Sequence, residues 1–233
     1  MVKTAGTIKA VIFDLDDTLY DCSGTLVVRG RRQVARTIAQ LINCSEEEAY
    51  QLQLEMEEKY GVKSNIYEKI VSLYRLPDTY TNELLNEFIH TEISGITIFP
   101  DVIDTLKQLK ALGLRLFLVT SGDAQIQGKK IDALKLREGY FDRIIIVERS
   151  KAHTKKDCFV RLLEEYNLRP EELMCVGDKA DDELAASKSL GIVTVMFEHG
   201  RHYKAYLKEQ DRYVKPDYFI KHIKDVAGLM TFG

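Results

Sequence analysis

Four acidic residues crowd the end of one short apolar segment. In "VIFDLDDTLYD", residues 11–21, aspartates stand at Asp14, Asp16, Asp17 and Asp21. A single aspartate at such a place is usually a helix cap or a polar strand end. Carboxylates this close, however, raise one another's proton affinity and cost stability unless a cation offsets their charge. The cluster therefore indicates a place where a metal binds or a proton moves.

A second acidic cluster follows another apolar run. In "LMCVGDKADDELAA", residues 173–186, the run is followed by acids at Asp178, Asp181, Asp182 and Glu183. If the two runs are neighbouring parallel strands, their carboxyl ends meet, and Asp14, Asp16 and Asp178 should converge with one of the later acids. Carboxylate oxygens in this number suit magnesium, whereas zinc prefers His or Cys ligands. The sequence therefore predicts a Mg²⁺ site.

Short apolar runs rich in Val, Ile, Phe and Leu predict the strands that would carry these acids. The runs cover residues 8–15, 114–120, 143–147, 172–177, 192–197 and 217–220. Their continuous apolarity is typical of a parallel sheet that is covered on both faces. Helical patterns lie between them, as at residues 99–113, where Pro100 and Asp101 signal a start and Gly113 an end. We therefore expect an α/β fold with a three-layer, doubly wound, mostly parallel sheet.

The first predicted strand is separated from the next by a long stretch that is nearly all helical in pattern. Apolar residues recur at three- and four-residue spacing in "RRQVARTIAQLI", "SEEEAYQLQLEMEEKY", "IYEKIVSLYRL" and "TNELLNEFIH". Ser45 and Glu48 also predict a capping box at one helix start. We expect residues 1–19 and 97–233 to form the core and residues 20–96 a helical cap that could open and close over the site.

The acidic clusters resemble two motifs of the haloacid dehalogenase-like (HAD) superfamily. "DLDDT" is similar to its first motif, D-x-D-x-T, and "GDKADDE" to its fourth. Two further motifs stand between them in the expected order. "LFLVTSGD" resembles the second, a strand that ends in Thr or Ser, and "SKAHTKKDCFVRLLEEYN" supplies the third, a lysine before a helix. Lys155 fits this lysine best, but the usual Lys-Pro pair is missing, so Lys151 and Lys156 stay open.

The resemblance implies a role for each motif residue. Asp14 would be the nucleophile that forms an aspartyl-phosphate, and Asp16 the general acid and base. The implied phosphate-binding residues are Thr120, Ser121 and Lys155, the last also catalytic. The implied magnesium ligands are Asp14, Asp16 through its backbone carbonyl, Asp178, and a further acid that is Asp182 or Glu183, with Asp181 behind them. Spacing alone does not choose between these later acids.

Asp16 also separates the branches of this superfamily. The dehalogenase branch typically lacks an acid two residues after the nucleophile, so the chain resembles the phosphatase branch with a helical C1-type cap. We therefore expect a magnesium-dependent phosphomonoester hydrolase that acts on a small phosphorylated metabolite through an aspartyl-phosphate. A phosphomutase of the same superfamily is the main alternative. A 2-haloacid dehalogenase and a non-catalytic phosphometabolite sensor are disfavoured, because neither needs both Asp14 and Asp16.

The composition favours small partners. The chain carries 33 basic and 36 acidic residues, mixed along its length, for a formal charge of -3, so it shows no electrostatic footprint for nucleic acid or an anionic membrane. The apolar run before Asp14 is too short for a secretory core or a membrane span. The four cysteines show no metal-finger or C-x-x-C spacing, which predicts reduced thiols. We expect a cytoplasmic protein that binds neither nucleic acid nor membrane, while the pattern leaves its oligomeric state open.

Overall fold

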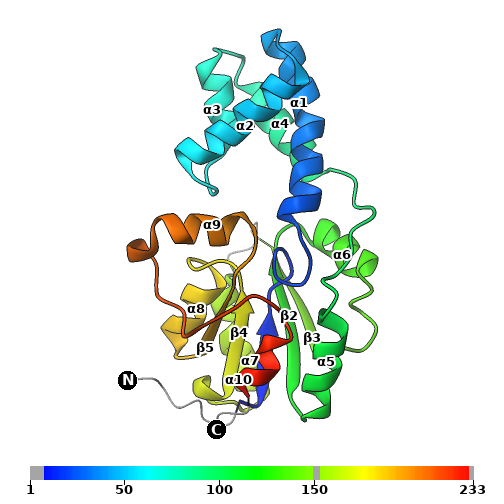
Figure 1. Ribbon diagram of the computed structural model, residues 1–233, viewed down its shortest axis with the longest axis vertical. Helices are drawn as coiled ribbons and strands as arrows, with labels where there is room; N and C mark the ends of the chain where they lie inside the picture. Colours follow the sequence, from blue (N-terminus) through cyan, green and yellow to red (C-terminus); the bar gives the residue numbers. More distant parts are fainter. Residues whose placement is uncertain (1–7, 149–152, 231–233) are drawn as a thin grey trace. The chain divides into compact units, whose positions relative to one another are not determined.

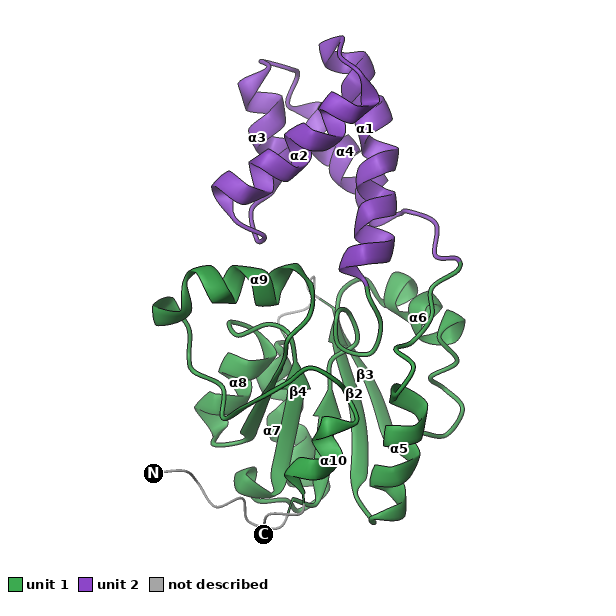
Figure 2. Ribbon diagram, viewed as in Figure 1, with its two compact units in different colours: residues 1–21, 95–233 green, residues 22–94 purple. Residues whose placement is uncertain are grey.

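The chain folds into two compact units. The computed structural model describes residues 8–148 and 153–230. One unit combines residues 1–21 and 95–233, and the other consists of residues 22–94 (Figure 2). Each unit has a hydrophobic core of its own. The first unit holds the sheet and the second is helical.

Six strands of the first unit form one sheet. In spatial order they are β3 (Arg143–Val147), β2 (Arg115–Ser121), β1 (Ala10–Phe13), β4 (Leu173–Gly177), β5 (Val193–Phe197) and β6 (Tyr218–Ile220) (Figure 1). Every pairing between neighbouring strands is parallel. All residues of β1, β4 and β5 are buried, because helices cover both faces of the sheet. The predicted doubly wound parallel sheet is confirmed.

The sheet lies between two layers of helices. The helices of this unit are α5 (Val102–Ala111), α6 (Ala124–Ala133), α7 (Lys155–Glu165), α8 (Glu183–Leu190), α9 (Gly200–Lys208) and α10 (Asp225–Leu229). Helix α7 packs against α8 in one layer, and α5 packs against α10 in the other. Phe117 and Phe159 are fully buried in the layer between α7 and the sheet. Each such side chain stabilises the fold by about 1.5–3 kcal/mol. Single-turn 3-10 helices cover Pro170–Glu172 and Gln210–Arg212.

The helical unit contains four helices packed around their own apolar core. They are α1 (Val28–Ile42), which a short π-helix (Ser23–Val27) precedes, α2 (Glu46–Tyr60), α3 (Ile66–Leu73) and α4 (Thr79–Ile89). Ile38, Ile70 and Leu84 are fully buried among them. The predicted capping box at the start of α2 is confirmed, since Ser45 and Glu48 bond reciprocally. Four amphipathic helices are thus inserted between β1 and the crossover helix α5 that leads to β2.

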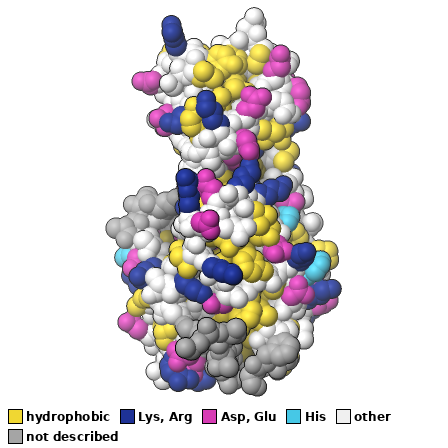
Figure 3. Space-filling model, turned by 60° about the vertical axis from the view of Figure 1, so that its left-hand side comes forward, with side chains coloured by type: hydrophobic (Ala, Val, Ile, Leu, Met, Phe, Trp, Pro, Cys, Tyr) yellow, Lys and Arg dark blue, Asp and Glu magenta, His cyan; other side chains and the backbone are white. Residues whose placement is uncertain are grey.

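The charges on the surface and the cysteines do not indicate a particular binding partner. Basic and acidic side chains are interspersed on the face drawn in Figure 3. Cys22, Cys44, Cys158 and Cys175 are free thiols. Within the described part of the chain, no helix combines the length and the apolarity that crossing a membrane requires.

Candidate active site

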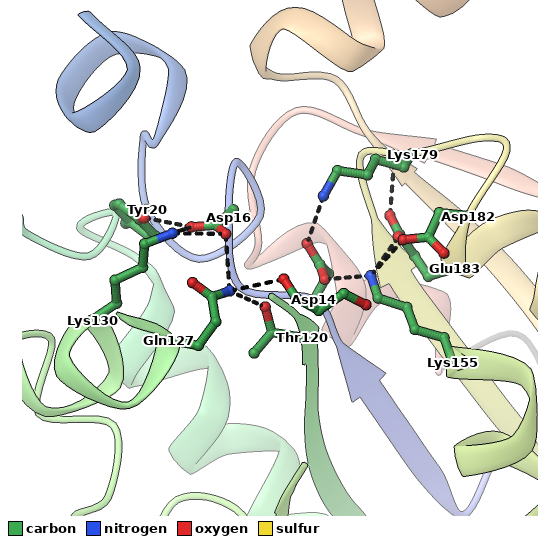
Figure 4. Close-up of polar contacts among 11 residues, drawn as sticks. Asp14, Asp16, Tyr20, Thr120, Gln127, Lys130, Lys155, Lys179, Asp182 and Glu183 are labelled. Carbon is green, nitrogen blue, oxygen red and sulfur yellow. Dashed lines mark hydrogen bonds and ion pairs between the residues drawn. The ribbon is translucent and has the colours of Figure 1, made fainter. Parts of the chain in front are cut away.

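Three neighbouring strands in the middle of the sheet end at the same edge and bring the predicted motifs together (Figure 4). Asp14 follows β1, Thr120 and Ser121 end β2, and Asp178 follows β4. The parallel register continues past β1, because the backbone N–H of Asp14 donates to the carbonyl of Val176 over 3.0 Å. Segments that are far apart in sequence thus place their polar residues at one point, as parallel strands require.

A buried acidic cluster occupies this point. Asp14, Asp178 and Glu183 are each at most 1% exposed and place one oxygen apiece within 4.8 Å of one another. Burial raises the pKa of Asp178 well above its usual value; the charge of Lys179 opposes this shift, and the carboxylates of Glu183, Asp14 and Asp17 add to it. Among the described residues, none donates a hydrogen bond to either oxygen of Asp178 or to Oδ2 of Asp14. Buried carboxylates without donors fit cation ligands, and an all-oxygen set fits Mg²⁺.

Lys155 reaches into this cluster from the first turn of α7. Its Nζ lies 2.7 Å from Oδ1 of Asp14, 2.7 Å from Oε2 of Glu183 and 3.3 Å from Oδ2 of Asp182. Burial alone would lower the pKa of Lys155, but these carboxylates raise it well above its usual value. Of the two alternatives, Lys156 is exposed and Lys151 lies outside the described residues. The geometry therefore favours Lys155 as the lysine of the third motif.

A second lysine, which the sequence analysis did not single out, also enters the cluster. Lys179 directly follows Asp178, and its Nζ lies 3.9 Å from Oδ2 of Asp14. Burial opposes its charge, yet the carboxylates of Asp14 and Asp178 raise its pKa above the usual value. Asp14 thus has one ammonium group near each of its oxygens. Its position directly after a motif aspartate is the sequence feature that could have indicated this role. The same feature would also be found for a lysine that is exposed in a turn.

Asp16 does not join the acidic cluster with its side chain. Its carboxylate accepts hydrogen bonds from Lys130 at 2.9 and 3.0 Å, from Gln127 at 3.1 Å and from the hydroxyl of Tyr20 at 2.5 Å. Burial would raise the pKa of Asp16, but the positive charges of Lys130 and Lys179 and these hydrogen bonds lower it well below its usual range. Asp16 is therefore held as a carboxylate.

The other two aspartates of the opening cluster face a third place. Asp17 adopts a left-handed conformation with φ 58°, and oxygens of Asp17 and Asp21 lie within 4.8 Å of a ring nitrogen of His199. Nε2 of His199 is 3.0 Å from Oδ1 of Asp21. The four neighbouring acids therefore diverge into three environments, and of the four only Asp14 belongs to the cluster with Asp178 and Glu183.

The end of β2 supplies a buried hydroxyl. Thr120 is 1% exposed, and its Oγ1 accepts a hydrogen bond from Nε2 of Gln127 over 2.6 Å. Ser121 is half-buried, and its carbonyl lies 3.4 Å from the same nitrogen. Gln127 and Lys130 are contacts that the sequence analysis missed. Their signal was faint: both fall on the buried face of α6 together with Ile131.

The later acids separate by burial. Glu183 begins α8 and is 1% exposed, and its Oε1 accepts the backbone N–H of Lys179 over 2.7 Å. The side chain of Asp182 is 39% exposed, and its Oδ2 lies 3.3 Å from Nζ of Lys155. Of the two candidates for the last ligand, the geometry favours Glu183.

Gly177 makes room for Glu183 at the end of β4. A Cβ at this position would lie 2.4 Å from Oε1 and 2.6 Å from Cγ of Glu183. We expect Gly177→Ala to displace Glu183 and to lower the free energy of unfolding by about 1–3 kcal/mol. Thermal unfolding measures the loss. Gly228→Ala is the control, because no atom lies within 4 Å of a Cβ there, and an unchanged melting temperature in Gly177→Ala would contradict the prediction.

Comparisons with known proteins agree with this arrangement. A family model described as haloacid dehalogenase-like hydrolase matches residues 8–189, and one described as HAD-hydrolase-like matches residues 154–226. The chain is 30% identical over 202 residues to a glyceraldehyde 3-phosphate phosphatase of Methanopyrus kandleri, with 84% of this chain and 86% of that protein covered. It is 31% identical over 139 residues to a phosphoglycolate phosphatase of Escherichia coli, with 58% and 51% covered.

Solved structures share the fold. One is the putative HAD-hydrolase YfnB of Bacillus subtilis bound to magnesium, with a TM-score of 0.60 and 14% identity over 97% of this chain and 100% of that one. The first family model spans most of the chain and includes all four motifs. The chain therefore belongs to the haloacid dehalogenase-like hydrolases.

Proposed function

We propose that this hydrolase is a magnesium-dependent phosphomonoesterase that acts on a small phosphorylated metabolite through an aspartyl-phosphate. The observation that carries the proposal is the environment of Asp14. This carboxylate is buried, and one oxygen is bonded to Lys155 while the other accepts no hydrogen bond from the described residues. A carboxylate that is held in place by a lysine and keeps one oxygen free of hydrogen bonds suits nucleophilic attack on phosphorus.

The proposed reaction has two displacements. In the first, an oxygen of Asp14 forms a bond to phosphorus while the bond to the ester oxygen breaks, and the carboxylate of Asp16 passes the proton of the monoanionic phosphate group to that oxygen. In the second, a water attacks the same phosphorus, Asp16 takes its proton, and the bond to Asp14 breaks to release phosphate. Lys130 stabilises the ionised form of Asp16, which is the form that accepts the water proton.

Neighbouring groups would hold the phosphoryl oxygens and the metal. Lys155, the hydroxyl of Thr120 and Ser121 would contact the phosphoryl group. The residues that would hold Mg²⁺ are Asp14, Asp178, Glu183 and the backbone carbonyl of Asp16. Bound there, Mg²⁺ would offset the negative charge of the carboxylates and of the phosphoryl group. The role of residues 22–94 as a cap that selects the substrate stays a prediction.

The names of the relatives narrow the substrate class. Two relatives are named for glyceraldehyde 3-phosphate and phosphoglycolate. Both compounds are short carbon chains with one phosphate ester and, at the other end, an aldehyde or a carboxylate group. We therefore propose a small phosphorylated aldehyde or acid as the first substrates to test.

Phosphate release with and without metal tests the proposal. We expect the purified protein to hydrolyse p-nitrophenyl phosphate, glyceraldehyde 3-phosphate or phosphoglycolate in the presence of Mg²⁺, to stop when EDTA is added, and to recover when excess Mg²⁺ is restored. A phosphomutase would transfer the group to another sugar phosphate and release little inorganic phosphate. Equal phosphate release with Mg²⁺ and with EDTA would contradict the proposal.

A further inference from the structure

We propose that Gln127 and Lys130, which lie on one face of α6, are positioning residues that hold the carboxylate of Asp16 and the hydroxyl of Thr120 for the reaction. The inference rests on the proposed function and adds two residues to it. It starts from a contrast along α6: Lys129 is exposed, whereas Lys130 is 9% and Gln127 2% exposed.

Lys130 binds both oxygens of Asp16. Its Nζ lies 2.9 Å from Oδ1 and 3.0 Å from Oδ2, so the ammonium group straddles the carboxylate. The hydroxyl of Tyr20 donates to Oδ1 as well. A carboxylate with donors on both oxygens keeps a fixed rotation, because turning it would break charge-assisted hydrogen bonds. Lys130 therefore determines where Asp16 points.

Gln127 connects Asp16 to the end of β2. Its amide nitrogen donates to Oδ2 of Asp16 over 3.1 Å and to Oγ1 of Thr120 over 2.6 Å. Because Oγ1 of Thr120 accepts this bond, its own hydrogen remains available as a donor. A phosphoryl oxygen is the acceptor that the proposed reaction brings to this hydroxyl. One amide thus orients a donor for phosphate and the group that transfers protons.

The local structure keeps these two side chains in place. Residues three apart in a helix share a face, which sets Gln127 and Lys130 side by side. The side chain of Asp123 caps the start of α6 by accepting the backbone N–H groups of Gln125 and Ile126 at 2.9 and 3.0 Å. A Cβ on Gly122 would lie 3.1 Å from Cγ of Gln127, so the glycine gives Gln127 its approach to the strand end.

A double-mutant cycle distinguishes positioning from a merely structural role. The variants are Lys130→Met, Asp16→Asn and their combination, with Lys130→Arg to restore the charge and Lys129→Met as the exposed control on the same helix. Turnover of p-nitrophenyl phosphate with Mg²⁺ gives kcat and KM for each, the Asp16→Asn series being followed at raised enzyme concentration. Melting temperatures verify that every variant is folded.

If Lys130 acts through Asp16, Lys130→Met lowers kcat by about 10- to 100-fold with little change in KM, because a misplaced catalytic group costs about this much. Lys130→Arg recovers part of the loss, and Lys129→Met has no effect. In the Asp16→Asn background, we expect Lys130→Met to change kcat by no more than about 2-fold. A change of this size is within the usual error of a double-mutant cycle. The loss is thus present only when Asp16 is.

Four results would overturn the inference. Unchanged kcat in Lys130→Met, or the same fold-loss with and without Asp16, would remove Lys130 as a positioning residue while the proposed function stands. A change confined to KM would do the same. A wild-type protein without metal-dependent turnover would overturn the proposed function, and the inference with it.

A second cycle tests the link to Thr120. Gln127→Leu removes the donor contacts to Asp16, to Thr120 and to the carbonyl of Ser121. We expect it to raise KM and lower kcat by about 10-fold each, since a lost hydrogen bond to a charged group costs about 1.5–3 kcal/mol. In a Thr120→Val background the effect on KM should disappear. An effect on KM that persists there would show that Gln127 does not act through Thr120.

Discussion

Asp14→Asn is expected to abolish phosphate release while leaving the fold intact. An amide cannot form the acyl-phosphate bond, and loss of a nucleophile typically lowers kcat by at least about 10⁴-fold. Asparagine has the same shape as aspartate, and its amide oxygen can still accept the hydrogen bond that Lys155 gives to Oδ1 over 2.7 Å. The substitution therefore removes the reactive group with little disturbance of its surroundings.

The measurement is p-nitrophenol release with Mg²⁺, together with the melting temperature. Asp21→Asn is a matched control from the same loop, because Asp21 faces His199 instead of the acidic cluster. We expect this control to keep its turnover. Metal-dependent release that survives in Asp14→Asn would show that another group attacks phosphorus or that the activity belongs to a contaminant. Equal and negligible turnover in wild type and variant would favour a phosphometabolite sensor.

The fold could be predicted because its signals are local. Each of the six strands is a continuous apolar run, and in a sheet covered on both faces such a run needs no partner to be recognised. The structure shortens some of them: β1 covers Ala10–Phe13, where the pattern predicted residues 8–15. These differences arise at the strand ends, because a residue counts as part of a strand only if it pairs with a neighbouring strand. The sequence of a single strand does not show where this pairing stops.

The site could be predicted only where it follows from strand ends. Asp14, Thr120 and Asp178 stand at the ends of three parallel strands, so their convergence follows from topology. The contact between Lys130 and Asp16 spans 114 positions and depends on how α6 is rotated against the sheet. A lysine on the inner face of a helix has the same sequence pattern whether it ends in solvent or in an ion pair.

Which of the two neighbouring acids joins the cluster depends on the three-dimensional structure. Asp182 and Glu183 are adjacent in the chain and both carry a carboxylate. Helix α8 begins at Glu183, and the buried position of this residue brings its longer side chain to Lys155 at 2.7 Å. The rotation of a helix start is set by tertiary packing, which composition and spacing do not report.

Asp178→Asn is expected to abolish metal-dependent turnover and, without metal, to make the protein more stable. Asp178 is fully buried, and among the described residues none donates to either of its oxygens. Such a carboxylate costs free energy that the nearby ammonium group of Lys179 offsets only in part and a bound cation would offset further. An amide of the same shape carries no charge and can donate to the neighbouring carboxylates. Stability and activity should therefore respond to this substitution in opposite directions.

The pH dependence of the metal-free protein follows from the same burial. Burial and the neighbouring carboxylates raise the pKa of Asp178 in the folded state. The folded wild type therefore binds a proton that the unfolded chain releases near its usual pKa of about 4. Its free energy of unfolding should fall as pH rises from about 4 toward the raised pKa of Asp178, and the part due to Asp178 should be absent in Asp178→Asn.

Melting temperatures in EDTA and in Mg²⁺ measure both effects. A cation that binds only the folded state adds about 2.7 kcal/mol at a concentration 100 times its Kd, or several degrees for a chain of this size, at about 2–4 °C per kcal/mol. We expect this gain in the wild type and in Asp181→Asn, a control from the same turn that is not part of the cluster of Asp14, Asp178 and Glu183, but not in Asp178→Asn. A Mg²⁺-dependent gain that survives in Asp178→Asn would place the ion elsewhere. A lower melting temperature of Asp178→Asn in EDTA would contradict the prediction, because it would mean that this carboxylate stabilises the fold without a metal.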